Sequence, residues 1–281
     1  MQKSIILILV ALILFSCKKV SLQDKDIQSP VSVASSNRIV AGTSILQWQK
    51  CLGGSSDDFG NAVAKTTDGY FVAGYTTGIN GSHDAMVVKI DLNGTVVWQT
   101  IIGGSGTDEA AGVVSTLDGG CLVTGYTNSN DGDITGKSKG GRDVLLFKLK
   151  PDGTKDWLTT LGGSGYDRAF AIIKNTSDAG YALAGNTTSI DGDVAASQVI
   201  NGIADVWLVK FNISAGVLAI DWQRTIGITC SKDDVAYSLV QSPNDYSYTI
   251  AGSTLSNTSS ADILIINVDV GGWIWMVKNR K

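Results

Sequence analysis

The sequence predicts an all-β domain built from about four copies of one unit, each unit holding four antiparallel strands. Three observations support this fold class. Tryptophans recur along the chain, at Trp48, Trp98, Trp157, Trp222 and Trp275. Short apolar segments of about five to eight residues alternate with Asp-Gly and Asn-Gly turns, which supply the positive φ of two-residue hairpins. No segment sustains the apolar spacing of an amphipathic helix.

The composition is that of a folded chain rather than a disordered one, because 43% of the 281 residues are hydrophobic and 17% are charged. The 33 glycines, against only 3 prolines, indicate many tight turns. The net charge is −4, and no basic run exceeds Lys18-Lys19. We therefore expect no nucleic-acid partner, since nothing would neutralise a row of phosphates.

The chain begins with an apolar run, residues 5–15, which is the length of a signal sequence and too short to span a bilayer. The run ends in Leu14-Phe15-Ser16-Cys17, which resembles a lipobox. That resemblance implies that Cys17 is diacylated and anchors the protein to the outer membrane of the cell envelope. It does not indicate whether the protein lies on the periplasmic or the surface-exposed side. The alternative is an ordinary signal peptide with an incidental cysteine. Residues 18–44 are polar and predict a flexible tether, and residues 45–281 hold the repeat.

Within each copy, a glycine pair or its remnant follows the tryptophan and leads to an aspartate, a first strand and a turn. A second strand and a variable loop come next, then another aspartate that opens a third strand, and a hairpin back to the next tryptophan. The first aspartate series is Asp58, Asp108, Asp167 and Asp234, and the second is Asp84, Asp143, Asp205 and Asp262. Four antiparallel strands in about 50 to 65 residues form one blade of a β-propeller.

Four complete blades are expected, at residues 60–102, 110–161, 169–226 and 235–278. Residues 45–52 remain as an extra strand that carries Trp48. The chain is then either a four-bladed ring with a redundant edge or an incomplete, truncated propeller with an open arc.

Two stretches resemble known families. The segment Lys89–Trp98, repeated as Lys148–Trp157, is similar to the Trp-docking hairpin of quinoprotein-like propellers. The pattern Leu-Gly-Gly-Ser-Gly, then Asp, Asp-Gly-Gly-Tyr and Ala-Gly-Tyr resembles β-propeller repeats in secreted and lipid-anchored proteins of Bacteroidetes-type bacteria. The resemblance covers about residues 45–281. It implies the fold and says little about activity, because one fold hosts many functions.

The repeated residues have a structural and a functional interpretation. Rings of aspartates could bind a cation or polar sugars, but carboxylates also fix turns by accepting backbone N–H bonds, and a residue found in every copy favours structure. The regular spacing of Trp48, Trp98, Trp157 and Trp222 likewise favours packing between blades over a sugar-stacking platform. Trp273 is the expected exposed aromatic.

Metal and cofactor chemistry have little support. Asp131, Asp133, Asp191 and Asp193 sit in two Asp-Gly-Asp loops whose oxygens suit Ca²⁺, although no EF-hand spacing is present; no other cofactor is expected. A quinone would need a cationic and aromatic central pocket, and no such cluster is evident. The only histidine, His83, is interpreted as a loop residue. The odd set Cys51, Cys121 and Cys230 predicts three small buried residues or a Cys51–Cys230 bridge.

No catalytic residue stands out, so the sequence predicts a non-catalytic binding or scaffolding module for a glycan or a protein partner. The alternative is a carbohydrate-active enzyme of glycoside hydrolase type, or its accessory subunit, because 26 acidic residues are available to form a catalytic pair, although none is singled out. A degenerate product that keeps the fold without activity is a third interpretation.

Overall fold

The computed structural model describes residues 47–78, 82–194, 203–214, 216–227, 233–255 and 260–273. The predicted signal peptide, residues 1–17, and the tether, residues 18–44, lie outside these ranges, as does Cys17. Among the described residues, no helix has the length and apolar character needed to cross a membrane.

The described chain is all-β, as predicted, and its strands form four separate antiparallel sheets that we call blades 1 to 4. Blade 1 holds β1 (Asp58–Lys65), β2 (Gly69–Thr77), β3 (His83–Asp91) and β4 (Val96–Ile102). Blade 2 holds β5 (Asp108–Ser115), β6 (Cys121–Thr127), β7 (Asp143–Leu149) and β8 (Lys155–Leu161).

Blade 3 holds β9 (Asp167–Lys174), β10 (Tyr181–Thr187), β11 (Asp205–Ser214) and β12 (Val217–Ile226). Blade 4 holds β13 (Asp234–Gln241), β14 (Tyr248–Leu255) and β15 (Ala261–Val268). A single turn of 3-10 helix, Gly132–Ile134, interrupts the β6–β7 loop. The predicted blade limits are confirmed to within one or two residues, while the fourth strand expected in blade 4 lies outside the described residues except for Trp273.

The expected extra strand at residues 45–52 is not a regular strand in its described part, residues 47–52, where Leu52 alone forms an isolated β-bridge. Trp48 nevertheless packs on blade 1 from this segment, as described below.

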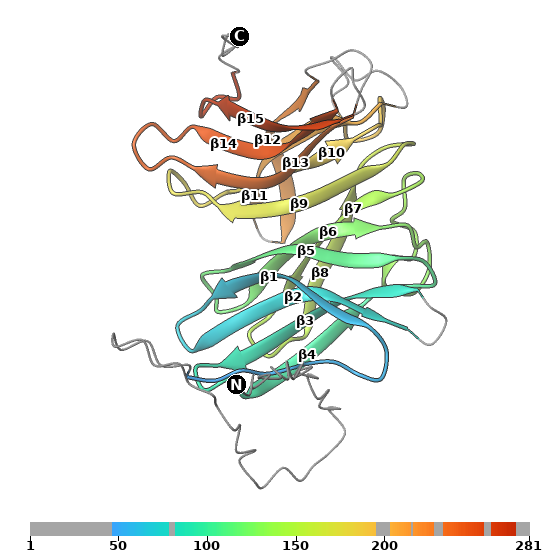
Figure 1. Ribbon diagram of the computed structural model, residues 1–281, viewed down its shortest axis with the longest axis vertical. Helices are drawn as coiled ribbons and strands as arrows, with labels where there is room; N and C mark the ends of the chain where they lie inside the picture. The colour runs from blue at the N-terminus through green and yellow to red at the C-terminus, as the bar shows by residue number, and fades with distance from the viewer. Residues whose placement is uncertain are drawn as a thin grey trace, which may run out of the picture.

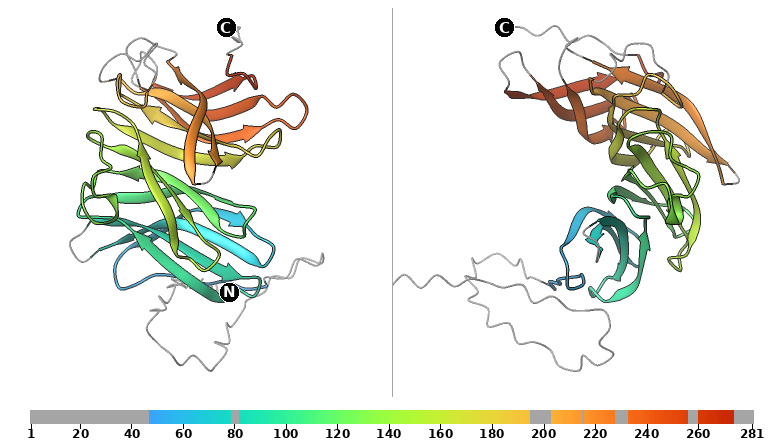
Figure 2. Two further views of the ribbon diagram at one scale, coloured as in Figure 1. Left: turned by 180° about the vertical axis from the view of Figure 1, so that it is seen from behind. Right: turned by 90° about the vertical axis from the view of Figure 1, so that its right-hand side faces the viewer.

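The blades follow one another in chain order along a curve, with strands β1, β5, β9 and β13 innermost and in contact from blade to blade (Figure 1). Figure 2 shows blade 1 and blade 4 at opposite ends of this arc. Each strand alternates its side chains between the two faces of its blade. Ala85 and Val87 of β3 therefore face blade 2, where they join Leu145 and Phe147 in one buried cluster.

A tryptophan connects each blade to the next through the β-hairpin that joins the third and fourth strands. The Trp98 Nε1–H of blade 1 donates to the Pro151 carbonyl of blade 2, at 2.9 Å. Its ring lies on Gly153, whose φ is +84° and where a Cβ would come within 2.6 Å of the indole. Glycine is required there both for the left-handed backbone and for the close approach of the ring.

The same contact recurs at both ends of the arc. Trp48 donates to the Leu92 carbonyl at 2.9 Å and covers Gly94, and Trp222 donates to the Val270 carbonyl at 3.2 Å and covers Gly272. Trp48, Trp98 and Trp222 are thus each fixed by one indole hydrogen bond and one glycine. Trp157 differs, because its buried Nε1–H has no hydrogen-bond partner among the described residues and its ring lies 3.9 Å from a Cβ placed on Gly216.

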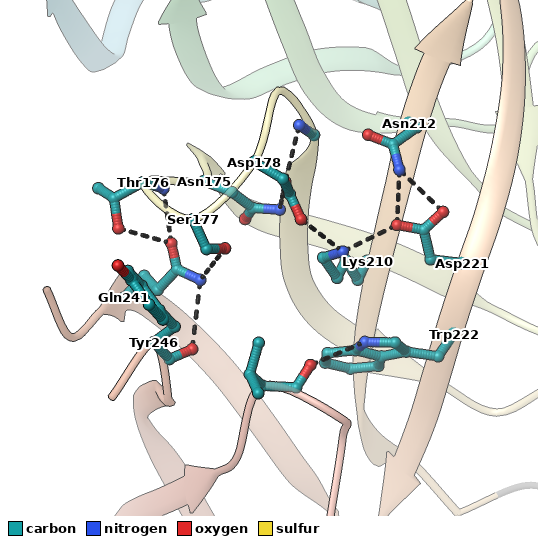
Figure 3. A network of polar contacts seen from close by, with 12 residues as sticks. Asn175, Thr176, Ser177, Asp178, Lys210, Asn212, Asp221, Trp222, Gln241 and Tyr246 are labelled. Atoms are coloured by element: carbon teal, nitrogen blue, oxygen red, sulfur yellow. Dashed lines mark hydrogen bonds and ion pairs between the residues drawn. The ribbon is translucent and has the colours of Figure 1, made fainter. Parts of the chain in front are cut away.

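Ion pairs of a lysine close the hairpin end of blades 1 to 3, whereas blade 4 has Asn267 in place of the lysine. Lys210, at the end of a buried run of β11, lies between Asp178 at 2.8 Å and Asp221 at 2.9 Å (Figure 3). In blade 2, Lys148 lies between Asp118 at 2.5 Å and Asp156 at 3.0 Å. Burial opposes the ionisation of Asp118, but hydrogen bonds from Lys148 and Thr116 outweigh it and lower its pKa to about 2.

A β-bulge in the fourth strand of blades 2 and 3 places the second aspartate of each network beside the lysine. The register of β8 and β12 shifts just before the tryptophan, at Asp156 and Asp221, so that one extra residue bulges from the ladder and turns its carboxylate to the lysine. Gln241 of blade 4 adds a link between blades, because its side chain accepts the Thr176 N–H at 2.7 Å and donates to Ser177 (Figure 3).

Replacing Gly153 by alanine tests the tryptophan contact. We expect Gly153→Ala to lose about 1–2 kcal/mol from the left-handed backbone and about 1–3 kcal/mol more from displacement of the Trp98 ring. Gly136 is the matched control, because its φ is +70° and no atom lies within 4 Å of the added Cβ. Gly136→Ala should cost the backbone part alone. Urea unfolding of both variants measures the difference, and equal losses would contradict a packing role for Gly153.

Candidate functional site

The first aspartate series fixes the loops at the opposite end of the blades from the tryptophan hairpins. Asp108 is fully buried at the start of β5. Its carboxylate accepts the Gly104 N–H at 2.8 Å, the Ser129 hydroxyl at 2.7 Å and the Thr127 hydroxyl. These contacts join the Gly-Gly loop before β5 to the loop after β6.

The contacts repeat in blade 3, where Asp167 accepts hydrogen bonds from Gly163, Ser189 and Thr187. Asp58 of blade 1 accepts the Gly54 N–H at 2.8 Å, and Asp234 of blade 4 is fully buried. These are contacts of residues that hold loops in place.

The structure brings the second aspartate series against the first across each blade boundary. Asp143, at the start of β7, and Asp167 of the next blade lie on the same glycine, Gly162. Burial, and then the neighbouring Asp167, raise the pKa of Asp143, although the Lys139 N–H opposes the shift. Burial and the charge of Asp108 raise the pKa of Asp84 in the same way. Asp262 is exposed and has no such partner blade among the described residues.

Asp205 of the second series has a strongly raised pKa. It is buried at the start of β11, where desolvation and then the carboxylates of Asp234 and Asp233 raise its pKa to about 6. A like charge beside a buried carboxylate disfavours ionisation. The boundary between blades 3 and 4 is therefore electrostatically strained at neutral pH.

The four aspartates predicted for Ca²⁺ bind the backbone of a neighbouring loop or a lysine. Asp131 accepts the Ser105 N–H at 2.6 Å and Asp191 accepts the Ser164 N–H at 2.7 Å. Asp133 pairs with Lys155, and Asp193 pairs with Lys139. In the described part of the chain, no three His, Cys, Asp or Glu side chains are grouped so that they could hold a metal ion. Each of the four aspartates therefore has a protein partner without any metal, and Ca²⁺ binding stays a prediction.

Of the cysteines, Cys121 is a free thiol that is fully buried, and burial raises its pKa to about 12. Cys51 is disulfide-bonded, and Cys230 lies outside the described residues, so the Cys51–Cys230 bridge stays a prediction. Trp273 is exposed, as predicted.

A cluster of ionisable and aromatic side chains from blades 1 to 3 lies around the starts of the inner strands β5 and β9, and we call it the Tyr126 cluster. It consists of Tyr75, His83, Glu109, Tyr126, Arg142 and Arg168. His83 Nδ1 lies 2.6 Å from Glu109 Oε1, and the His83 ring stacks on Tyr75 at 4.2 Å between centroids. The cluster therefore joins blade 1 to blade 2.

Two arginines meet at one tyrosine on the other side of Glu109. The guanidinium carbons of Arg142 and Arg168 lie 4.7 Å and 5.2 Å from the centre of the Tyr126 ring. Both distances fall within the range of a cation–π contact. Among the described residues, the Nε atoms of both arginines are buried without a hydrogen-bond partner. Desolvation, and then Arg142, lower the pKa of Arg168.

The Tyr126 cluster corrects two sequence-based expectations. His83 is the first residue of β3 and is paired, rather than a loop residue. A cationic and aromatic cluster is present, although none was evident from the sequence. The signal was the repeat itself, because Glu109 and Arg168 each follow an aspartate of the first series and occupy the same position on adjacent inner strands.

No protein-family model matches the sequence, and no curated protein does so. Solved structures show a distant likeness. A periplasmic gluconolactonase from Pseudomonas aeruginosa is 11% identical, with a TM-score of 0.40 over 78% of this chain and 71% of that one. A subtype N10 neuraminidase-like protein of A/little yellow-shouldered bat/Guatemala/060/2010 is 10% identical, with a TM-score of 0.42 over 76% of this chain and 57% of its own.

A GH43_12 protein retrieved from a capybara gut metagenome is 11% identical, with a TM-score of 0.41 over 78% of this chain and 41% of its own. The chain spans less than two thirds of the last two structures. At these identities the likeness concerns the fold alone.

The carboxylates at the boundary of blades 3 and 4 make stability depend on pH. The folded pKa of Asp205, about 6, lies above the ordinary value of 3.8, so its ionisation opposes folding. The penalty is fully present above about pH 6 and disappears as the pH falls below about 4. We expect Asp205→Asn to raise the free energy of unfolding at pH 8 by up to about 3 kcal/mol, with the gain vanishing at pH 4.

Urea unfolding at the two pH values measures this effect. Asp262→Asn is the matched control, since Asp262 occupies the same repeat position but is exposed; it should change stability by less than about 0.5 kcal/mol. A gain for Asp205→Asn that persists at pH 4 would argue against like-charge strain.

Proposed function

We propose that the chain is a non-catalytic binding module of the cell envelope that recognises an anionic glycan at the Tyr126 cluster. The observation that carries the proposal is the pair of arginines on one tyrosine ring. A guanidinium offers planar, forked donors that match a carboxylate. Two guanidinium groups with buried, unpaired Nε–H donors are costly to hold beside one ring, and the charge of an anion bound near Arg142 and Arg168 would offset that cost.

Aromatic side chains near the arginines support a sugar ligand. Tyr166 is exposed beside Arg142, with which it forms a parallel bridge between blades 2 and 3. Phe59 is exposed on the other side and stacks on Tyr75 at 4.9 Å. Aromatic faces of this kind provide an apolar surface on which the ring of a sugar can lie, while the charged groups fix its orientation.

The chemistry of the cluster favours binding over catalysis. Glu109 is already engaged by His83, and it also accepts a hydrogen bond from Tyr126. Burial, and then that hydrogen bond to Glu109, raise the pKa of Tyr126, which keeps the phenol neutral. A neutral tyrosine and an occupied carboxylate make a poor nucleophile and a poor general acid. A carbohydrate-active enzyme is the alternative that the same experiment tests.

The proposed location rests on the leader. Lipid on Cys17 and the polar residues 18–44 would hold the module near the outer membrane on a flexible tether. Such an arrangement suits capture of a polymer, because the module can sample positions around its anchor.

Galacturonic acid oligomers test the ligand class, with their methyl esters as uncharged counterparts. We expect saturable binding of the acid form, and at least a tenfold loss in Arg168→Gln, since hydrogen bonds to charged groups contribute about 1.5–3 kcal/mol. Lys174→Gln is the control, because it removes one positive charge at the far end of the same strand, β9.

Isothermal titration calorimetry measures the affinity of each variant for the acid and ester oligomers, and analysis of the oligomers afterwards detects any cleavage. Equal binding of acid and ester, or equal effects of the two variants, would contradict an arginine-bound anion. Cleavage of the oligomers would instead establish the enzyme alternative.

The anchor has a separate test. We expect the wild-type chain to incorporate an alkyne-labelled palmitate and to fractionate with membranes, and Cys17→Ala to lose both properties. Cys121→Ala serves as the control cysteine variant, because Cys121 is buried and free. Labelling that survives in Cys17→Ala would exclude the lipobox interpretation.

A further inference from the structure

Blade 4 leaves an apolar face uncovered at one end of the arc. Ile263 and Ile265 of β15 are 85% and 61% exposed. The residues at the same repeat positions in blade 3, Val206 and Leu208, are 0% exposed because blade 4 packs on them. Val240 of β13 is exposed on this end as well. We call Val240, Ile263 and Ile265 the outgoing face.

Blade 1 has the complementary face at the other end. Val63 of β1 is 66% exposed, whereas Val113 at the same position of blade 2 is 6% exposed and packed against blade 1. Val63, Val72, Met86 and Val88 line a hollow of about 540 Å³ on this face, together with Trp48 and Leu52. We call Val63, Val72, Met86 and Val88 the receiving face, in which Trp48 and Leu52 already pack against Met86 and Val88 and leave Val63 exposed.

The two faces are the halves of an interface that the chain already forms three times. In each internal case, the outgoing positions of one blade pack on the receiving positions of the next, as Ala85 and Val87 pack on Leu145 and Phe147. The end faces thus carry side chains of the right kind, at the right positions, for each other. They lie at opposite ends of the arc (Figure 2), so one chain does not bring them together.

The receiving face lacks the contact of three strands of a packed blade, because Trp48 already supplies the contact of the fourth strand. Trp48 already occupies the place that Trp98 of blade 1 takes on blade 2, with its indole hydrogen bond to Leu92 and its ring on Gly94. The contact of a fourth strand is therefore supplied, and the hollow lies where three inner strands would stand. Blade 4 presents three strands, β13 to β15, within the described residues.

We propose that a second copy of this chain covers these faces, with blade 4 of one copy seated on blade 1 of the next. The contact is head-to-tail, because it joins two different surfaces. Repetition of such a contact gives a closed ring when the rotation closes and a filament when it does not. The Tyr126 cluster takes no part in this contact, so the proposal stands apart from glycan binding.

Two blocked variants of the full-length chain test the contact by sedimentation velocity. Ile263→Glu with Ile265→Glu blocks the outgoing face, and Val63→Glu blocks the receiving face. The wild-type chain should associate as its concentration rises, and each blocked variant should be at least tenfold weaker. Val217→Glu, which alters an equally exposed valine away from both faces, should associate as the wild type does.

Mixing the two blocked variants gives the decisive result. Each keeps one intact face, and the intact faces are complementary, so the mixture should form one-to-one dimers and nothing larger. Urea unfolding verifies that both variants remain folded. A wild-type chain that stays monomeric, blocked variants that associate as the wild type does, or a mixture without dimers would each overturn the proposal.

Discussion

The packing of one blade on the next is the interaction on which the rest of this structure depends. A single four-stranded sheet cannot bury both of its faces, and here each inner face is buried only by its neighbour. The tryptophan of one blade and the hairpin glycine of the next set the position of that contact. At Trp48, Trp98 and Trp222 the indole N–H is satisfied by a backbone carbonyl, and the ring leaves no room for a side chain at the glycine. Because each contact is local, the stability of the chain is close to a sum over blades and boundaries.

The opposite end of the blades is built from carboxylates, and this explains why loops can vary there. Asp108 and Asp167 each tie three groups from two loops to the start of an inner strand. With the loop bases fixed, the second residue of each inner strand is free to differ from blade to blade. That position holds Phe59, Glu109 and Arg168, and the Tyr126 cluster forms around them. A uniform scaffold therefore presents a non-uniform site.

Much of the fold could be predicted from the sequence, because each strand and hairpin carries its own local signal. Aspartate-glycine turns, short apolar segments and the tryptophan spacing predicted the blade limits to within two residues. The Tyr126 cluster could not be found in the same way. Its members are distant in the sequence, Arg142 from a loop and His83 from another blade, and they meet only because the blades curve around their inner strands. The predicted Ca²⁺ ligands show the reverse case, since a carboxylate pattern that suits a metal equally suits backbone amides and lysines.

The closure of the propeller is a property that no single blade encodes. The three internal boundaries use the same positions with different side chains: alanine and valine meet leucine and phenylalanine between blades 1 and 2, while larger residues such as Trp207 fill the next boundary. Small changes in side-chain volume at each boundary alter the angle between blades, and those angles add along the arc. A repeat read from sequence therefore gives the number of blades in the chain but leaves their total rotation undetermined. The exposed isoleucines of blade 4 and the hollow on blade 1 follow from this, because an arc with uncovered ends must present one half of its own internal interface at each of them.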